Sequence, residues 1–119
     1  MKKAFITGIT GQDGAYLSKL LLEKGYEVHG GVRRISQPET PRLEQLGIEK
    51  DVELHEFDLA EVNNINRIIR GNDYDEFYNL AAQSFVGSSW ELPAYAADVN
   101  GVGVVRILDS LRTFSPETR

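Results

Sequence analysis

Gly8-Ile9-Thr10-Gly11-Gln12-Asp13-Gly14 is the stretch that decides the fold of this 119-residue chain. It stands between a short apolar run, Ala4-Phe5-Ile6, and a helical pattern that begins near Gln12. We therefore expect a strand that enters a tight glycine turn, followed by a helix whose first N–H groups form a site for phosphate. Gly8 and Gly11 would let the backbone turn and approach a dinucleotide pyrophosphate, and Gly14 would let the helix lie close to the strands.

The three glycines follow the spacing G-x-x-G-x-x-G instead of the more familiar G-x-G-x-x-G. The alternative to a phosphate site is a glycine-rich turn that binds nothing. We consider that alternative weaker, because three glycines in one turn weaken a fold unless another group must come close.

The composition indicates one ordinary globular domain over residues 1–119, with 41% hydrophobic and 26% charged residues. A net charge of −5 argues against nucleic acid as a partner, and no apolar run approaches the ~18 residues that span a membrane. The absence of cysteine excludes disulfides, thiolate metal sites and a Cys nucleophile. His29 and His55 fall in separate strand-like runs without metal-ligand spacing, so no metal site is predicted. The first residues lead directly into a strand, and we expect a cytoplasmic protein without a signal peptide.

Strands and helices alternate along the chain. Strands are expected at residues 2–7, 26–32, 52–57 and 76–82. Helices are expected at residues 12–24, about 42–46 and about 93–111. A further helix is expected between the third and fourth strands, where Val62, Ile65, Ile68 and Ile69 form an apolar stripe. This order predicts an α/β fold: a Rossmann-type parallel sheet of order 3-2-1-4 with helices on both faces, truncated after about four strands.

Two details of the helices are also predicted. In the first helix, Tyr16 and Leu20 form an apolar i,i+4 pair while Ser18 faces outward. In the last helix, Gly101 and Gly103 each cost up to about 1 kcal/mol against Ala, which predicts close packing against a neighbouring helix.

Arg33-Arg34 follows the second strand, about 20 residues after the glycine turn. An acidic residue there is typical of NAD sites, whereas a basic residue accommodates the 2′-phosphate of NADP. Guanidinium groups match phosphate in geometry and charge, so the pair favours NADP. The alternative is a solvated basic pair in a loop.

Two positions at the ends of later strands have two interpretations each. Asp58, after the third strand, could accept a hydrogen bond from the adenine amino group or cap the next helix. Ala81 and Ala82 at the exit of the fourth strand would leave room for a flat ligand, but small residues also serve close packing.

Several segments together resemble the GDP-mannose 4,6-dehydratases, a family of extended short-chain dehydrogenases/reductases. They are the opening glycine stretch with its Gln12-Asp13 pair, residues 22–30, Val32-Arg33-Arg34, Tyr78-Asn79-Leu80-Ala81-Ala82-Gln83-Ser84, and Tyr95 followed by Ala97-Asp98-Val99. The resemblance extends over essentially the whole chain.

The resemblance implies NADP as cofactor, GDP-mannose as substrate and a homo-oligomeric enzyme. Residues Gly8 to Asp13 would surround the pyrophosphate, Arg33 and Arg34 would meet the 2′-phosphate, and Asp58 and Leu59 would flank adenine. The ribose and nicotinamide path would be lined by Leu80, Ala81, Ala82, Gln83 and Ser84, with Tyr95 nearby. Ser84 and Phe85 would stand closest to the sugar nucleotide.

The family's catalytic Tyr-x-x-x-Lys pair has no counterpart here. The residues four positions after each tyrosine are Leu20, Gly30, Tyr78, Ala82 and Val99. The family members are also much longer. We therefore predict that no catalytic residue lies in this chain and that it is the N-terminal NADP-binding portion of a longer lyase, inactive alone.

The whole enzyme would convert GDP-mannose to GDP-4-dehydro-6-deoxymannose by internal hydride transfer and dehydration. The alternatives are a stand-alone nucleotide-binding module and part of a related nucleotide-sugar epimerase or reductase. Gln12-Asp13 and Gln83-Ser84 argue against the latter. In the truncated sheet the fourth strand would be an exposed edge, open to pairing with another chain.

Overall fold

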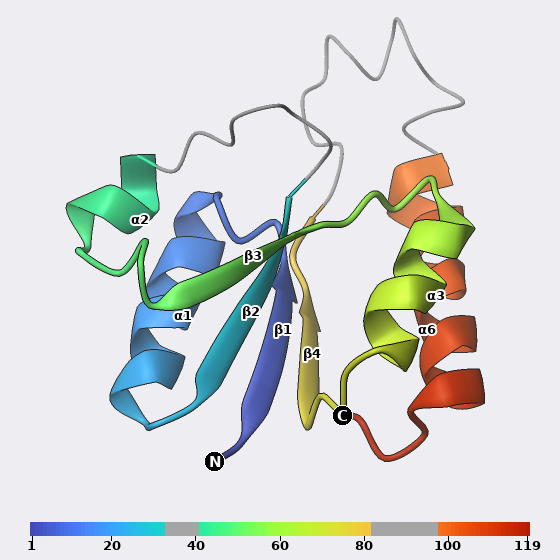
Figure 1. The fold of residues 1–119 in the computed structure, drawn as a ribbon. Coiled ribbons are helices and arrows are strands. Elements are labelled where there is room, and N and C mark those ends of the chain that lie inside the picture. Colours follow the sequence, from blue (N-terminus) through green and yellow to red (C-terminus); the bar gives the residue numbers. More distant parts are fainter. Residues whose placement is uncertain (33–40, 82–97) are drawn as a thin grey trace, which may run out of the picture.

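A four-stranded parallel sheet forms the centre of the protein in a computed structural model that describes residues 1–32, 41–81 and 98–119 (Figure 1). Its strands run in the order β3-β2-β1-β4. Their bounds are Lys3–Thr7 for β1, Glu27–Val32 for β2, Val52–Glu56 for β3 and Glu76–Asn79 for β4. The predicted α/β class, strand order and parallel pairing are therefore confirmed.

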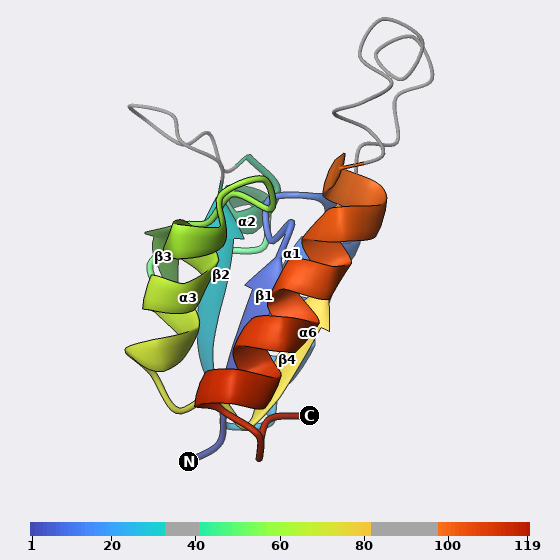
Figure 2. The ribbon, with the colours of Figure 1, turned by 90° about the vertical axis from the view of Figure 1, so that its right-hand side faces the viewer.

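Helices cover both faces of the sheet. Helix α1 (Gln12–Glu23) and the short α2 (Pro41–Gln45) lie on one face, and α3 (Val62–Arg70) and α6 (Gly103–Phe114) lie on the other (Figures 1 and 2). A π-helical turn, η1 (Asp98–Val102), leads into α6. No helix within the described ranges combines the length and apolar character needed to cross a membrane.

The alternation of side chains along β1 divides the core into two clusters. Ala4 and Ile6 point toward α1 and join one cluster, whereas Phe5 points the other way and joins the cluster beneath α3 and α6. All three side chains are fully buried. Strand β1 is therefore the centre of the molecule, and its carboxyl end holds the glycine turn in a fixed position.

The predicted faces of the first helix are partly wrong. Ser18 is fully buried, while Tyr16 and Leu20 are 59% and 48% exposed. The Ser18 hydroxyl donates to the Gly14 carbonyl at 2.7 Å, which satisfies its polar group inside the helix. A small side chain with an internal hydrogen bond can therefore face the sheet where a larger one would not fit.

The later elements also differ from their predicted bounds. Strand β4 ends at Asn79 and not at Ala82, and the last helix, α6, ends at Phe114 and not at Leu111. The predicted start of that helix, near residue 93, lies outside the described residues. A Cβ on Gly103 would lie 3.0 Å from the Leu59 Cβ, so its close neighbour is the segment after β3 and not a helix. Gly101 has no atom within 4 Å of its Cβ position, and close packing does not explain it.

The outer edge of β4 is partly paired. The Arg119 N–H donates to the Asp75 carbonyl at 3.0 Å, and the Phe77 N–H donates to the Arg119 carbonyl at 2.6 Å. This is the bonding pattern of a parallel bridge. The edge that was expected to be open is thus occupied at this point by the chain itself.

Candidate functional site

The glycine turn lies at the carboxyl end of β1, where open α/β sheets bind ligands. Gly8 has a positive φ of +69°, and the Gly11 N–H donates to the Gly8 carbonyl at 3.0 Å to close the turn. A Cβ on Gly8 would approach the Ala81 nitrogen to 2.9 Å. Both its conformation and its surroundings therefore require glycine at position 8.

Gly14 holds the start of α1 against the turn. A Cβ there would lie 2.4 Å from the Gly8 carbonyl oxygen and 2.7 Å from the Ile9 Cα. The predicted close approach of the helix is present, but the neighbour is the backbone of the turn and not the strands. Gly14 is accordingly buried.

Gly11 serves a different purpose from the other two glycines. It is the N-cap of α1 with φ −75° and ψ 174°, a conformation open to any residue, and no side chain caps the helix. The N–H groups of Gln12, Asp13 and Gly14 have no acceptor within the helix, because the first turn of any helix leaves its donors unpaired. Backbone donors and the positive end of the helix dipole thus meet beside Gly11, as a phosphate requires.

A cation lies beside the same turn. The Arg42 guanidinium, from α2, donates to the Thr10 carbonyl at 3.3 Å. Together with Gln12, Arg42 lines a pocket of about 140 Å³ between α1 and α2. Sequence reasoning did not assign Arg42, because nothing in its local pattern indicates contact with a turn 32 residues away.

Thr7 joins the ends of the two central strands. Its buried hydroxyl donates to the Asn79 side-chain oxygen at 2.6 Å and accepts from the Ala81 N–H at 3.0 Å. These bonds hold the chain after β4 against Gly8. Leu80, in the same segment, has a residue surface that is 42% exposed. Sequence reasoning missed this role, since a threonine at the end of a strand has no distinguishing pattern.

Two predicted cofactor residues have buried side chains. Ile9 is fully buried, and it fills the space left by Gly30, where a Cβ would lie 2.3 Å from the Ile9 Cδ1. Leu59 is 4% exposed and packs in the cluster with α3 and α6. Ile9 and Leu59 can therefore contact a ligand mainly through their backbone atoms. The Leu59 carbonyl already accepts a hydrogen bond from Arg106 at 2.9 Å.

Asp58 stabilises a turn and not the cap of the next helix. Its Oδ1 accepts from the Ala60 N–H at 2.9 Å, whereas the N-cap of α3 is Glu61. The Asn64 side chain fixes the same segment by accepting from the Asp58 N–H at 2.7 Å. The interpretation of Asp58 as the cap of the next helix is therefore wrong. Its contact with adenine stays a prediction.

An ion pair attaches the start of α6 to the segment after β3. Arg106 donates to both carboxylate oxygens of Asp98, at 2.7 and 3.0 Å, as well as to the Leu59 carbonyl. The hydrogen bond from Arg106 lowers the pKa of Asp98 below its ordinary value of 3.8. This pair orients η1 at the carboxyl edge of the sheet.

Seven predicted ligand contacts lie outside the described residues. They are Arg33, Arg34, Ala82, Gln83, Ser84, Phe85 and Tyr95.

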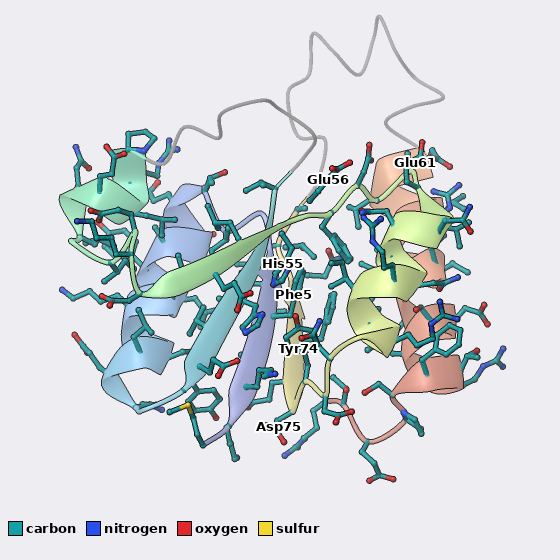
Figure 3. All side chains as sticks on the ribbon, in the orientation of Figure 1. Phe5, His55, Glu56, Glu61, Tyr74 and Asp75 are labelled. Atoms are coloured by element: carbon teal, nitrogen blue, oxygen red, sulfur yellow. The ribbon has the colours of Figure 1, made fainter. Side chains whose placement is uncertain are left out.

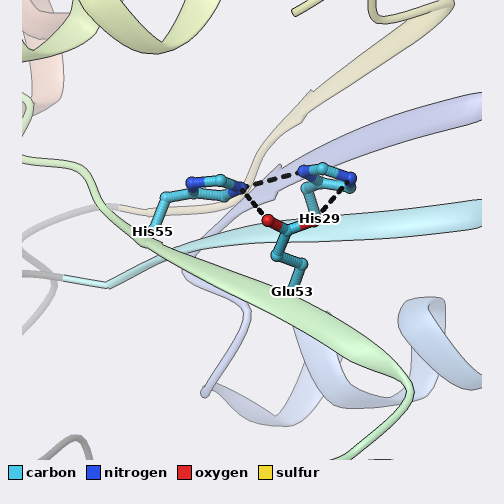
Figure 4. Close-up of side chains that lie close together, drawn as sticks. All are labelled: His29, Glu53 and His55. Carbon is cyan, nitrogen blue, oxygen red and sulfur yellow. Dashed lines mark hydrogen bonds and ion pairs between the residues drawn. The ribbon is translucent and has the colours of Figure 1, made fainter.

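The two histidines, which are far apart in sequence, lie together on one face of the sheet (Figure 4). His29 on β2 is paired in register with Glu53 on β3, and His55 follows two residues later on the same face. His29 Nδ1 lies 2.9 Å from His55 Nε2. Burial lowers the pKa of His55. His55 and Tyr74 also lie beside Phe5 (Figure 3).

Comparison with known proteins agrees with this geometry. A family model described as GDP-mannose 4,6 dehydratase matches residues 5–119. The chain is 51% identical over 118 residues to a GDP-mannose 4,6 dehydratase of Cricetulus griseus, a match that covers 94% of this chain and 32% of that protein. It is 47% identical over 117 residues to a GDP-mannose 4,6-dehydratase of Yersinia enterocolitica, again covering 94% and 32%.

Among solved structures, the chain is similar to the Bordetella bronchiseptica enzyme WbmH in complex with NAD+, with a TM-score of 0.76 and 26% identity. That match covers 95% of this chain and 36% of the other. The chain thus spans about a third of the length of the curated relatives reported above.

Proposed function

The chain belongs to the GDP-mannose 4,6-dehydratase family, and from this premise we propose that it is the dinucleotide-binding portion of an NADP-dependent enzyme of that kind, a lyase. The proposed substrate is GDP-mannose and the product GDP-4-dehydro-6-deoxymannose. A homo-oligomeric assembly, which the resemblance implies, and a cytoplasmic location, which was expected from the sequence itself, are part of the same proposal and stay predictions.

The uncapped amino end of α1 is the observation that supports this proposal most directly. Three first-turn N–H groups lie beside Gly11, at the carboxyl end of the central strand, with no side chain capping the helix. Gly8 and Gly14 allow the turn to fold so tightly that the helix begins immediately after the strand. A pyrophosphate bound there would accept hydrogen bonds from backbone donors and interact favourably with the helix dipole.

The residues of this chain would bind and orient the cofactor. When bound, NADP supplies a hydride acceptor that later returns the hydride. Thr7 would hold Leu80 and Ala81 at the required distance from the turn, and Arg42 would add positive charge beside Thr10. The proton-transfer pair Tyr-x-x-x-Lys is absent from the 119 residues, so in this proposal catalysis needs further residues.

The preference for NADP over NAD rests on Arg33 and Arg34. Both follow β2, whose last residue, Val32, lies at the same carboxyl edge as the glycine turn. Arginine forms bidentate hydrogen bonds with phosphate, and each charged bond contributes about 1.5–3 kcal/mol. Loss of one such bond would weaken binding of NADP by roughly 10–100-fold and leave binding of NAD nearly unchanged.

Calorimetric titration of the chain with NADPH and NADH tests the proposal. We expect NADPH to bind more tightly than NADH. Gly11→Val should abolish binding of both cofactors. It should retain the circular dichroism spectrum, because the φ angle at Gly11 suits any residue. Gly101→Ala is the matched control, since its Cβ would meet open space. Equal affinities would refute the assignment of Arg33-Arg34, and unchanged affinity of Gly11→Val would exclude the glycine turn as the pyrophosphate site.

A further inference from the structure

The His29 and His55 imidazoles face each other nitrogen to nitrogen (Figure 4). His29 Nδ1 and His55 Nε2 are 2.9 Å apart, the ring planes differ by only 12°, and the centroids are 5.0 Å apart. With so short a distance between nitrogens, the rings meet edge to edge, with Nδ1 of His29 facing Nε2 of His55. Imidazole nitrogens brought together in this way are the commonest metal ligands in proteins.

A carboxylate sets the orientation of the buried histidine. His29 Nε2 lies 2.6 Å from Glu27 Oε2. Since an ionised carboxylate only accepts, His29 donates through Nε2–H, and the neutral ring keeps its lone pair on Nδ1. Metal-binding histidines characteristically donate their second nitrogen to a carboxylate in this manner.

The lone pair of His29 has more neighbours than it can satisfy. Tyr74 Oη lies 3.1 Å from Nδ1, in addition to His55 Nε2 at 2.9 Å. The Tyr74 hydroxyl carries one hydrogen, which it can donate to that lone pair. When His55 also turns an N–H toward Nδ1, two donors compete for one lone pair, whereas a cation would accept lone pairs from both imidazoles.

Glu53 lies next to both histidines on the solvent side. Its Oε1 lies 3.8 Å from His55 Nε2, and its Oε2 lies 3.3 Å from His29 Nε2. One nitrogen or oxygen from each of His29, Glu53 and His55 lies within 4.8 Å of the others. The Glu53 side chain is 63% exposed and that of His55 is 20% exposed, so an ion can reach the cluster from water.

We propose that His29, His55 and Glu53 form a binding site for Zn²⁺ that joins β2 to β3, with Glu27 orienting His29. Two imidazoles and one carboxylate match the ligand preference of zinc, and water would complete a tetrahedron on the exposed side. Zn–N bonds of about 2.0–2.1 Å place two tetrahedral nitrogens about 3.3 Å apart, so the nitrogens need to separate by a few tenths of an ångström and the rings need to tilt until both lone pairs point to one ion. Nothing in this proposal depends on the dinucleotide site.

Zinc titration of the chain, with any affinity tag removed, tests the proposal. Zn²⁺ is titrated against a chromophoric chelator, and Co²⁺ is used as a spectroscopic substitute. Because His29 and His55 are the only histidines and the chain has no cysteine, binding that depends on histidine must use this pair. We expect one ion per chain and visible Co²⁺ absorption bands typical of four-coordinate nitrogen–oxygen ligation.

Variants separate the three roles. His55→Ala and Glu53→Gln remove ligands and should each weaken Zn²⁺ binding at least tenfold, and Glu27→Gln, which disturbs the orientation of His29 as well as the ion pair with Lys3, should weaken it about 10–100-fold. Glu56→Gln is the matched control, because Glu56 is exposed and its side chain points to the opposite face of β3 from His55. It should bind Zn²⁺ as the unchanged chain does.

Two results would overturn the proposal. One is the absence of stoichiometric binding at Zn²⁺ concentrations that saturate ordinary two-histidine sites, and the other is unchanged affinity in Glu53→Gln. Glu53 is largely exposed, so its variant should fold even where His55→Ala does not. Imidazole ¹⁵N chemical shifts give an independent check, since zinc must shift His29 Nδ1 and leave His29 Nε2 protonated.

Discussion

Replacing Gly14 with alanine should destabilise the fold although alanine is the better helix former. The added Cβ would lie 2.4 Å from the Gly8 carbonyl oxygen, 2.7 Å from the Ile9 Cα and 2.9 Å from the Ile9 carbonyl oxygen. All three neighbours are backbone atoms, so no side chain can rotate away. Restoring even a 3.0 Å contact requires the helix and the turn to separate by at least 0.6 Å.

The magnitude follows from two opposing effects. Overpacking a well-packed site costs about 1–3 kcal/mol, and the rigid backbone neighbours place Gly14 near the upper end of that range. Alanine in place of glycine within a helix raises the free energy of unfolding by about 1 kcal/mol. The expected net loss in the free energy of unfolding is therefore about 2 kcal/mol, which lowers the melting temperature by roughly 8 °C for a domain of this size.

Urea denaturation followed by circular dichroism, without any cofactor, measures this loss. Gly11→Ser is the matched control in the same turn, because its backbone conformation is unstrained and its Cβ, 3.3 Å from the Gly8 oxygen, requires a shift of only a few tenths of an ångström. Serine is a favoured N-cap, which offsets this shift, so the variant should keep nearly the stability of the unchanged chain. A Gly14→Ala chain as stable as the unchanged chain would refute the reasoning, as would an equal loss in both variants.

Three further predictions concern residues around the same edge of the sheet. Thr7→Val removes the buried acceptor of the Ala81 N–H and should cost about 2 kcal/mol of unfolding free energy, measured by urea denaturation. Ile9→Val should cost about 0.5–1.5 kcal/mol but leave the calorimetric affinity for NADPH unchanged, because that side chain lies in the core. Asp98→Asn should destabilise the chain at neutral pH and not in acid. The pKa of Asp98 is lowered by Arg106, so its stabilising effect is present above its ordinary pKa of 3.8 and is lost as the pH falls through the folded-state value. Unfolding curves of both chains from pH 7 to pH 2 should therefore converge, and a constant difference would contradict the ion pair's role.

Much of the fold was predictable because its signals are local. Alternation and helical periodicity lie within contiguous runs, and they located all four strands. The glycine spacing located the turn, whereas the positive φ at Gly8 emerged only from the structure. The helix faces were less predictable, since Ser18 lies in the core only because its hydroxyl bonds the Gly14 carbonyl.

The candidate sites divide in the same way. The glycine turn is a single stretch of seven residues, so its place between a strand and a helix could be predicted from residue types and spacing. The hydrogen bond between Ala81 and Thr7 joins residues 74 apart in sequence, and the contact between His29 and His55 joins residues 26 apart. No local pattern encodes such pairs.

By itself, the amino-acid sequence determined the alternation of strands and helices, the glycine turn and the absence of the Tyr-x-x-x-Lys pair. Only the tertiary structure decided that Ile9 and Leu59 are core side chains and that His29, Glu53 and His55 share one face. The physical reason is that backbone conformation depends on neighbouring residues, whereas burial and side-chain contacts depend on the register in which separate strands pair.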